Sequence, residues 1–244
     1  MSKNAILVGG AGTGKTSRLL DALAKMLDRG IDPYEVGFIS FTNAATQNAL
    51  TRACAKFGFS REALEQGGWF RTIHSFAFRL IGAKSSQVLT DETVKDREWF
   101  SQTMGFAPRE SEEPLDRSPQ ELTLAAWDVC RQRLEPWPVT LTRMSATESL
   151  PGLEHARDII DQYEQAKRLE NRLDFTDLLG RFAGVAFRHA DAGHGDTEPP
   201  GWLPGLESLI IDEAQDNSAL MDRCLRRLAD DSRYAVIAGD PFQS

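Results

Sequence analysis

The feature that most constrains the fold is a glycine-rich segment near the start of the chain, Gly9-Gly-Ala-Gly-Thr-Gly-Lys15-Thr16. It fits the phosphate-binding loop pattern of Gly, any four residues, Gly, Lys and then Ser or Thr. The apolar run of residues 5–8 precedes it and predicts a buried strand. Leucines and methionines at helical spacing follow it up to Gly30. A strand, a glycine-rich turn and a helix in this order predict an α/β fold.

The residue types of this loop suit the phosphates of a nucleotide. Glycines let backbone N–H groups approach phosphate oxygens, and the helix N-terminus adds the positive end of its dipole. Lys15 would reach the β- and γ-phosphates of ATP, and the Thr16 hydroxyl would ligate Mg²⁺. The predicted ATP-binding residues are Gly9, Gly10, Ala11, Gly12, Thr13, Gly14, Lys15 and Thr16.

Composition limits the class of protein. The 244 residues, 41% of them hydrophobic, suffice for one large domain or two modest ones. The three cysteines are scattered and read as reduced packing residues, and the four histidines show no metal-ligand spacing. The first strand begins almost at the N-terminus, which leaves no room for a signal peptide, so we expect a cytoplasmic location without a membrane span.

Charge is unevenly distributed along the chain, whose net charge is −8. Residues 1–83 carry ten Lys or Arg against six Asp or Glu, whereas residues 174–244 carry six against thirteen. A local basic surface, more than the global charge, decides binding to a phosphate backbone. The basic excess of the first third comes from residues that include Arg52, Lys56, Arg61, Arg71 and Arg79, for each of which a solvated surface position is the default expectation.

Strand signals recur at residues 5–8, 36–41, 69–73, 206–211 and 235–237, with helical patterns between them. This alternation predicts a parallel sheet with helices on both faces.

The alternation stops between residues 84 and 173, where the sequence looks helical throughout. We therefore expect one domain made of residues 1–83 and 174–244, with residues 84–173 inserted as a helical subdomain. Within the insertion, Thr90 before two acidic residues predicts a helix start, and residues 118–121 form a capping box.

The insertion and its surroundings also carry a long helix pattern and two loop signals. Residues 153–172 predict a long polar helix, and residues 110–119 a loop between helices. Residues 189–205 are rich in glycine and proline and predict a flexible loop.

Two further strands end in polar groups. The apolar run of residues 209–211 leads into Asp212 and Glu213. At the carboxyl end of a parallel strand, Asp212 would hold Mg²⁺ and Glu213 would orient and deprotonate the attacking water. Residues 235–238 form another apolar run, after which Gln243 could hydrogen-bond the γ-phosphate. The predicted catalytic residues are thus Lys15, Asp212, Glu213 and Gln243, and the metal ligands are Thr16 and Asp212.

Together these segments resemble the superfamily 1 DNA helicases of the UvrD/Rep type. Six elements carry the resemblance over the whole chain, in the family's order. They are residues 9–16, 40–45 (Ser-Phe-Thr-Asn-Ala-Ala), 72–76 (Thr-Ile-His-Ser-Phe), Tyr163 and Lys167 with 174–179 (Asp-Phe-Thr-Asp-Leu-Leu), 212–216 (Asp-Glu-Ala-Gln-Asp) and 239–244 (Gly-Asp-Pro-Phe-Gln-Ser).

The resemblance implies a RecA-like P-loop NTPase domain that binds ATP and Mg²⁺ and forms half of a helicase motor on single-stranded DNA. It implies DNA contacts for Phe41, Thr42, Asn43, Thr72 and His74. The family's second motor domain, which supplies arginines to the γ-phosphate, is not part of these 244 residues. We therefore expect the chain to act with that domain and to be nearly inactive alone. The family's usual glutamine after the acidic motif is Met221 here.

Other interpretations of these residues remain open. A small-molecule kinase with a phosphate loop, or a module that binds nucleotide without chemistry, would carry the same loop. Phe41 is as easily a core residue as a base-stacking one, and Thr42 and Asn43 suit helix capping as well as phosphate contacts. Core packing is the better expectation for Phe76, Trp127 and Trp137.

Overall fold

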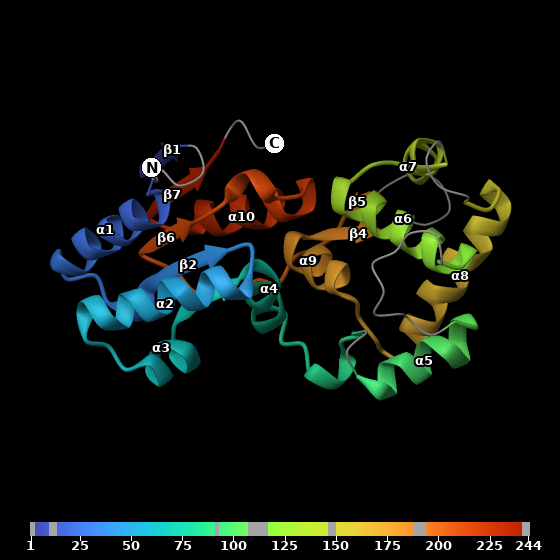
Figure 1. Ribbon diagram of the computed structural model, residues 1–244, viewed down its shortest axis with the longest axis horizontal. Coiled ribbons are helices and arrows are strands. Elements are labelled where there is room, and N and C mark those ends of the chain that lie inside the picture. The colour runs from blue at the N-terminus through green and yellow to red at the C-terminus, as the bar shows by residue number, and fades with distance from the viewer. Residues whose placement is uncertain are drawn as a thin grey trace. The chain divides into compact units, whose positions relative to one another are not determined.

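The computed structural model describes residues 3–9, 14–90, 93–106, 117–145, 150–187 and 194–240. The chain divides into two compact units (Figure 1). The first unit consists of Met1–Leu80 and Pro200–Ser244, and the second of Ile81–Pro199.

The first unit is built on a five-stranded parallel sheet with the strand order β1-β7-β6-β2-β3. This confirms the predicted α/β class. Each strand coincides with one of the apolar runs of the sequence, as expected for strands buried in a parallel sheet. The strands are β1 (Lys3–Val8), β2 (Val36–Ser40), β3 (Trp69–Thr72), β6 (Ser208–Ile211) and β7 (Tyr234–Gly239).

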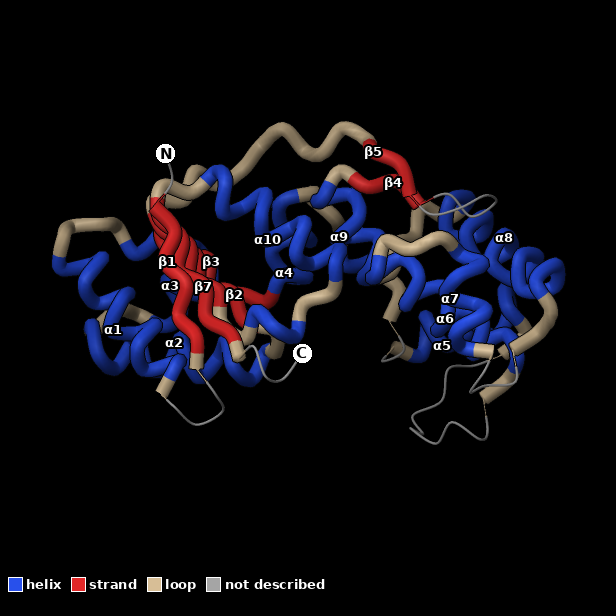
Figure 2. Tube along the Cα trace, turned by 90° about the horizontal axis from the view of Figure 1, so that it is seen from above, coloured by secondary structure: helices blue, strands red, loops and turns tan. Residues whose placement is uncertain are grey.

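Helices cover both faces of this sheet (Figure 2). On one face, α1 (Lys15–Asp28) and α2 (Asn43–Phe57) bury leucines against the apolar side chains of the central strands. On the other face lie α4 (Ile73–Leu80) and α10 (Ala219–Asp231), which contact each other. The short elements η1 (Pro33–Glu35), α3 (Arg61–Gly67) and η4 (Ala214–Asp216) complete the unit.

Strand β1, which leads into the phosphate loop, lies at one edge of the sheet. Within the described residues it pairs with β7 alone. Ile6 and Val8 are on the same side of the strand, and their side chains are 72% and 61% exposed. The intervening Leu7 packs against the core on the opposite face. This edge is therefore the least covered part of the sheet.

The parallel register brings the ends of all five strands to one edge. Val8 is level with Gly239, Ile39 with Ile211, and Ser40 with Thr72. The predicted site residues of this unit that the structure describes lie at the ends of these strands or shortly after them, and ligands of open α/β sheets bind at this edge.

The second unit is mainly helical. Its core holds Trp127 and Trp137, which are 1% exposed, together with Trp99, Ile160 and Tyr163. Both tryptophans are thus core residues, as expected. Its elements are η2 (Ser85–Gln87), α5 (Val94–Met104), α6 (Pro119–Arg133), α7 (Trp137–Met144), α8 (Leu153–Leu169), α9 (Phe175–Ala183) and the antiparallel pair β4 (Val185–Phe187) and β5 (His194–Asp196).

The limits of this unit differ from the expected 84–173. Residues 174–199, expected to lie in the sheet domain, belong to the helical unit. Asp174 and Asp177 at the start of α9 form ion pairs with Arg131 of α6 and Lys167 of α8. Phe187 of β4 packs against the helical core. These contacts hold the segment after residue 173 within the helical unit.

Three local expectations also change. The expected helix start at Thr90 is wrong: α5 begins after Thr93, whose hydroxyl accepts a hydrogen bond from the Asp96 amide. Thr90 instead donates its hydroxyl to the Asp96 carboxylate, 3.1 Å away. The long helix α8 ends at Leu169, and the expected loop 189–205 contains strand β5. The capping box of Ser118 and Glu121 is confirmed, and most of the expected loop 110–119 lies outside the described residues.

Candidate nucleotide-binding site

The first residue of the glycine-rich loop, Gly9, is held by the neighbouring strand, and its last glycine, Gly14, by helix α1. The Gly9 amide donates to the Gly239 carbonyl over 3.3 Å, and Gly14 caps α1 with a φ of 78°, in the left-handed region that favours glycine. Lys15 is therefore the first residue of α1, and it is only 8% exposed. Gly10, Ala11, Gly12 and Thr13 lie outside the described residues.

The acidic pair after β6 faces this helix start. Lys15 Nζ lies 3.3 Å from Glu213 Oε2, and the Thr16 hydroxyl donates to Asp212 Oδ2 over 3.1 Å. Lys15 and Glu213 are 198 positions apart in the sequence, and Thr16 and Asp212 are 196 positions apart. The topology of the sheet brings the two members of each pair together. The structure thus joins Lys15, Thr16, Asp212 and Glu213 in one cluster.

Asp212 is a buried carboxylate at the end of the strand. Its amide donates to the Ile39 carbonyl over 2.9 Å, which continues the sheet ladder by one residue. Burial raises the pKa of the Asp212 carboxyl; the Thr16 hydrogen bond opposes this rise, and the negative charge of Glu213 adds to it. A cation beside this carboxylate would offset the burial. The oxygen atoms of Thr16 and Asp212 are the ligand type that Mg²⁺ prefers, so the residues fit this ion.

Glu213 has an unusual backbone conformation. Its φ is 56°, in the left-handed region, which for a non-glycine residue costs on the order of 1–3 kcal/mol and is common at functional sites. The turn is supported by Asn217, whose side chain donates to the Ala214 carbonyl over 2.9 Å. This conformation sends the chain sharply away from the strand directly after Asp212.

Gln215, which the sequence analysis placed in the 212–216 segment without a role of its own, contacts Glu213 of the cluster and the Asp240 backbone. Its side-chain nitrogen donates to Glu213 Oε2 over 2.6 Å, and its oxygen accepts the Asp240 amide over 2.8 Å. The sequence signal for it was its place in the 212–216 segment, Asp-Glu-Ala-Gln-Asp, two residues after Glu213. Gln243, the expected γ-phosphate contact, lies outside the described residues.

The predicted DNA residues follow β2 and β3 on the same edge of the sheet. Phe41 is 42% exposed, so it is not a core residue. Thr42 caps α2 by accepting the Ala45 amide at 3.1 Å, which confirms its capping role, and Asn43 is the first residue of that helix. Because Ser40 pairs with Thr72, the two turns are neighbours.

On the second turn, Thr72 and His74 are half-buried. The Thr72 hydroxyl accepts the Ser75 amide at 3.3 Å. Phe76 is fully buried, as expected. A DNA-contacting role for Phe41, Thr42, Asn43, Thr72 and His74 stays a prediction.

Two of the basic residues are not simply solvated. Arg71 donates to the Glu65 carbonyl over 2.8 Å, and Arg79 donates to the Gly68 carbonyl over 3.1 Å and lies over the Trp69 ring. Burial lowers the pKa of Arg71, and the nearby Arg79 charge lowers it further. Both arginines therefore hold backbone carbonyls at the end of α3.

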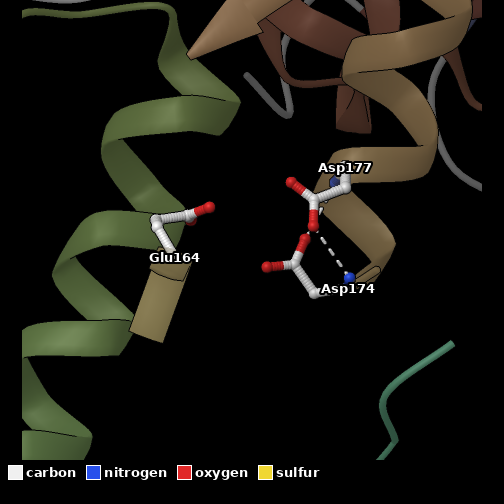
Figure 3. Close-up of side chains that lie close together, drawn as sticks. All are labelled: Glu164, Asp174 and Asp177. Carbon is white, nitrogen blue, oxygen red and sulfur yellow. Dashed lines mark hydrogen bonds between the residues drawn. The ribbon is translucent and has the colours of Figure 1, made fainter. Parts of the chain in front are cut away.

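Three carboxylates in the second unit also lie close enough to share a metal ion: Glu164, Asp174 and Asp177 (Figure 3). Lys167 Nζ already occupies the space between them, 3.1, 2.7 and 2.6 Å from their oxygens. Arg131, 3% exposed, pairs with the same carboxylates. We therefore interpret this cluster as a buried ion-pair network and not as a metal site.

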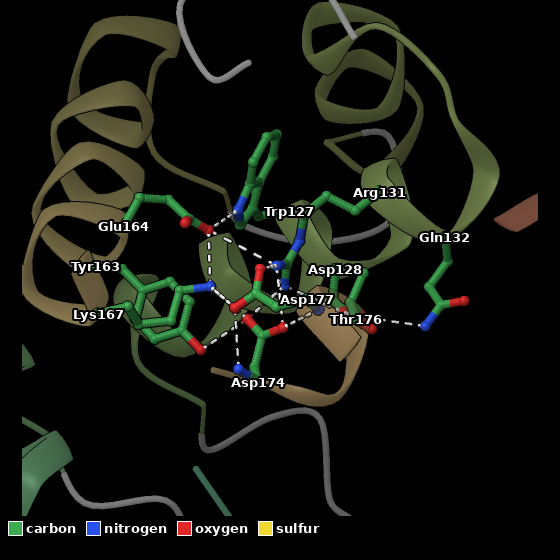
Figure 4. A network of polar contacts seen from close by, with 10 residues as sticks. All are labelled: Trp127, Asp128, Arg131, Gln132, Tyr163, Glu164, Lys167, Asp174, Thr176 and Asp177. Carbon is green, nitrogen blue, oxygen red and sulfur yellow. Dashed lines mark hydrogen bonds and ion pairs between the residues drawn. The ribbon is translucent and has the colours of Figure 1, made fainter. Parts of the chain in front are cut away.

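Further polar side chains surround the two cations (Figure 4). Tyr163 donates to Asp174 over 3.0 Å, and the Trp127 indole donates to Glu164 over 2.8 Å. The cations hold the pKa of Asp174 well below its usual range despite its burial, whereas burial and the Asp174 charge raise that of Asp177 to about 6. The network connects helices α6, α8 and α9.

Two of the three cysteines, Cys130 and Cys224, are buried thiols. Burial raises the pKa of Cys130 to about 11 and that of Cys224 to about 12, so both thiols stay protonated, and Cys54 packs at the edge of the core.

Met221 is 7% exposed and belongs to the buried face of α10. Among the described residues, no helix is both long and apolar enough to cross a membrane.

Comparisons with known proteins find relatives among DNA helicases. The ATP-dependent DNA helicase UvrD1 of Mycobacterium tuberculosis is 25% identical over 186 residues, which cover 74% of this chain and 23% of the relative. DNA helicase II of Escherichia coli is 25% identical over 246 residues, covering 99% of this chain and 32% of the relative. The ATP-dependent DNA helicase PcrA of Staphylococcus aureus is 31% identical over 84 residues, 34% of this chain and 11% of the relative.

This chain thus spans roughly a quarter to a third of the first two of these relatives, which cover most of it. The family model of the UvrD/REP helicase N-terminal domain matches residues 1–244. The chain has a five-stranded parallel sheet and an acidic pair that faces Lys15 and Thr16 at the start of α1. Together with the whole-length match, this shows that the chain belongs to the UvrD/REP helicase N-terminal domain family.

Proposed function

We propose that this chain is the ATP-binding N-terminal half of a superfamily 1 DNA helicase, which couples ATP hydrolysis to translocation on single-stranded DNA and to unwinding. The observation that carries the proposal is the cluster of Lys15, Thr16, Asp212 and Glu213, joined by contacts of 3.1 and 3.3 Å. The match of the whole chain to a helicase domain family disfavours the kinase alternative. A cytoplasmic location accords with Cys54, Cys130 and Cys224, none of which forms a disulfide in the described part of the chain.

The roles of the residues follow from their positions. Lys15 would bind the β- and γ-phosphates of ATP with a charge-assisted hydrogen bond. Glu213, beside Lys15, would orient the attacking water and accept its proton. Gln243 would contact the γ-phosphate, a role that rests on the sequence.

Thr16 and Asp212 would hold Mg²⁺, because their oxygen atoms lie side by side at the end of β6. A bound Mg²⁺ would neutralise charge that develops on the phosphates. The buried Asp212 carboxylate would gain a counter-ion by the same contact.

The DNA track would use the turns after β2 and β3. Phe41 is exposed there and could stack on a base, and the backbone and hydroxyls around Thr42 and Thr72 could contact phosphates. A second motor domain of the same protein would supply the far side of both the ATP site and the track. The greater length of the helicase relatives supports this part of the proposal.

The first test concerns nucleotide binding. Lys15→Ala removes a charge-assisted bond worth about 1.5–3 kcal/mol, so we expect affinity for Mg-ATP to fall roughly 10- to 150-fold. Titration calorimetry on the isolated chain measures this. Lys25→Ala, an exposed lysine on the same helix, is the matched control. Equal ATP affinity in wild type and Lys15→Ala would contradict the proposed site.

The second test separates the two acidic residues. Glu213→Gln should keep ATP binding and lower hydrolysis by the whole protein about 10²–10⁴-fold, because a general base contributes this much. Asp212→Asn should instead weaken Mg²⁺-dependent nucleotide binding. ATP turnover and calorimetry with and without Mg²⁺ measure the two effects, with the exposed Glu62→Gln on α3 as control. Normal hydrolysis by Glu213→Gln would exclude Glu213 as the base.

The third test concerns DNA. The isolated chain should bind single-stranded DNA weakly, with an affinity that falls steeply as salt rises. Phe41→Ala should weaken binding by about 1–3 kcal/mol if Phe41 stacks on a base. Tyr34, 43% exposed and located before β2 at the opposite end of that strand, gives the matched control Tyr34→Ala. Fluorescence anisotropy with a labelled oligonucleotide measures both, and tight binding at high salt or a preference for duplex would refute the track.

A further inference from the structure

Gln215 connects two strand ends that flank the candidate ATP site. It belongs to the short turn η4 after β6, and its side chain reaches across to the residue after β7. The amide nitrogen donates to Glu213 Oε2 over 2.6 Å, while the amide oxygen accepts the backbone N–H of Asp240 over 2.8 Å. One side chain thus fixes a carboxylate on one strand end and the backbone on the next.

The chemistry of these two contacts requires an amide. A carboxylate such as Glu213 only accepts hydrogen bonds, and a backbone N–H such as that of Asp240 only donates. A glutamine offers one donor and one acceptor at the end of a side chain of the right length. Glutamate would place a second negative charge against Glu213, and methionine would lose both bonds.

The backbone around this contact leaves little freedom. A side chain at Gly239 would place its Cβ 3.2 Å from Gln215 Oε1 and 3.5 Å from the Gln215 nitrogen, so the close approach suits glycine. The Gly239 carbonyl also accepts the Gly9 amide at the start of the phosphate loop. Gln215 therefore packs against the residue that anchors this loop.

The orientation of the Glu213 carboxylate depends on its hydrogen bond with Gln215. Its backbone is in the left-handed region, and its carboxylate has two partners within the described residues, Lys15 at 3.3 Å and Gln215 at 2.6 Å. In the proposed reaction, Lys15 would also bind phosphate. Gln215 is then the partner of Glu213 that makes no contact with phosphate and serves to orient the Glu213 carboxylate.

We propose that Gln215 is a positioning residue for ATP hydrolysis: it orients the Glu213 carboxylate and ties that orientation to the backbone after β7. This inference rests on the proposed function, in which Glu213 is the general base. It assigns no contact between Gln215 and the nucleotide, so binding and turnover should respond differently to its replacement.

The experiment compares Gln215→Glu and Gln215→Met in the whole protein that contains this chain, with single-stranded DNA present. Because a misplacement of about 1 Å can cost on the order of 100-fold in rate, we expect kcat for ATP to fall roughly 100-fold. The KM for ATP should stay within about twofold, since the phosphate contacts are untouched. The exposed Gln66→Glu on α3 introduces the same charge and should change neither constant.

A second measurement needs no turnover. In the isolated chain, hydrogen exchange at the Asp240 amide should accelerate at least about tenfold in both Gln215 variants, because that amide loses its acceptor. Wild-type kcat in both variants, or unchanged exchange at Asp240, would overturn the proposal. A parallel loss of ATP binding and thermal stability would also overturn it, because it would indicate a merely structural role. Failure of Lys15→Ala to weaken ATP binding would instead contradict the proposed function itself.

Discussion

Assayed alone, these 244 residues should hydrolyse ATP roughly 10³–10⁵ times more slowly than a whole helicase of the family, and they should unwind no DNA. The reason is that phosphoryl transfer needs positive charge on the γ-phosphate, and loss of an arginine finger costs a factor of this size. In the proposed motor this charge comes from the second domain. Nucleotide binding should persist, because Lys15 and Thr16 lie within the chain.

The measurement is steady-state ATPase activity with and without single-stranded DNA, beside a strand-separation assay. DNA helicase II of Escherichia coli, to which this chain is 25% identical, serves as the whole-protein reference. Robust DNA-stimulated turnover by the isolated chain would show that a cation from within it, or from a second copy, completes the site.

Lys167→Met should destabilise the helical unit by about 3–5 kcal/mol, because it removes one of the two buried cations, Lys167 and Arg131, that pair with three carboxylates. Lys167 is 2% exposed and contacts Glu164, Asp174 and Asp177. Burial alone would lower its pKa, but these carboxylates, Asp174 above all, raise it, so the lysine is charged in the folded protein. At roughly 2–4 °C per kcal/mol, Tm should fall by about 6–20 °C.

Circular dichroism during thermal and urea unfolding measures this loss. Lys95→Met on α5 is the matched control, because Lys95 is an exposed lysine of the same unit. A Tm unchanged by Lys167→Met would mean that Arg131 alone compensates the carboxylates.

The sequence predicted the sheet and the meeting of the side chains at the candidate ATP site because both depend on local patterns. Apolar runs bounded by turns marked the strands. Parallel strands bring their ends to one edge, so Lys15, Asp212 and Glu213 were expected together before any distance was known.

The features that escaped prediction depend on contacts between distant residues. The helical unit extends past the expected boundary at residue 174 because Arg131 binds Asp174 from 43 positions away, which no periodicity reveals. Gln215 was missed because its role depends on the adjacency of β6 and β7. Thr90 has the residue type of a helix cap, but its hydroxyl is used by the Asp96 carboxylate, and Thr93 takes the capping position.

The exposed β1 edge has a practical consequence for handling this chain. Among the described residues the outer edge of β1 has no partner strand, and Ile6 and Val8 are exposed, so this edge is a template for strand addition by other molecules. The net charge of −8 opposes this association by repulsion, and added salt screens the repulsion. Concentrated samples should therefore aggregate as ionic strength rises, under the same conditions that weaken DNA binding. Low protein concentration is thus needed whenever a salt titration is to report on DNA and not on oligomers.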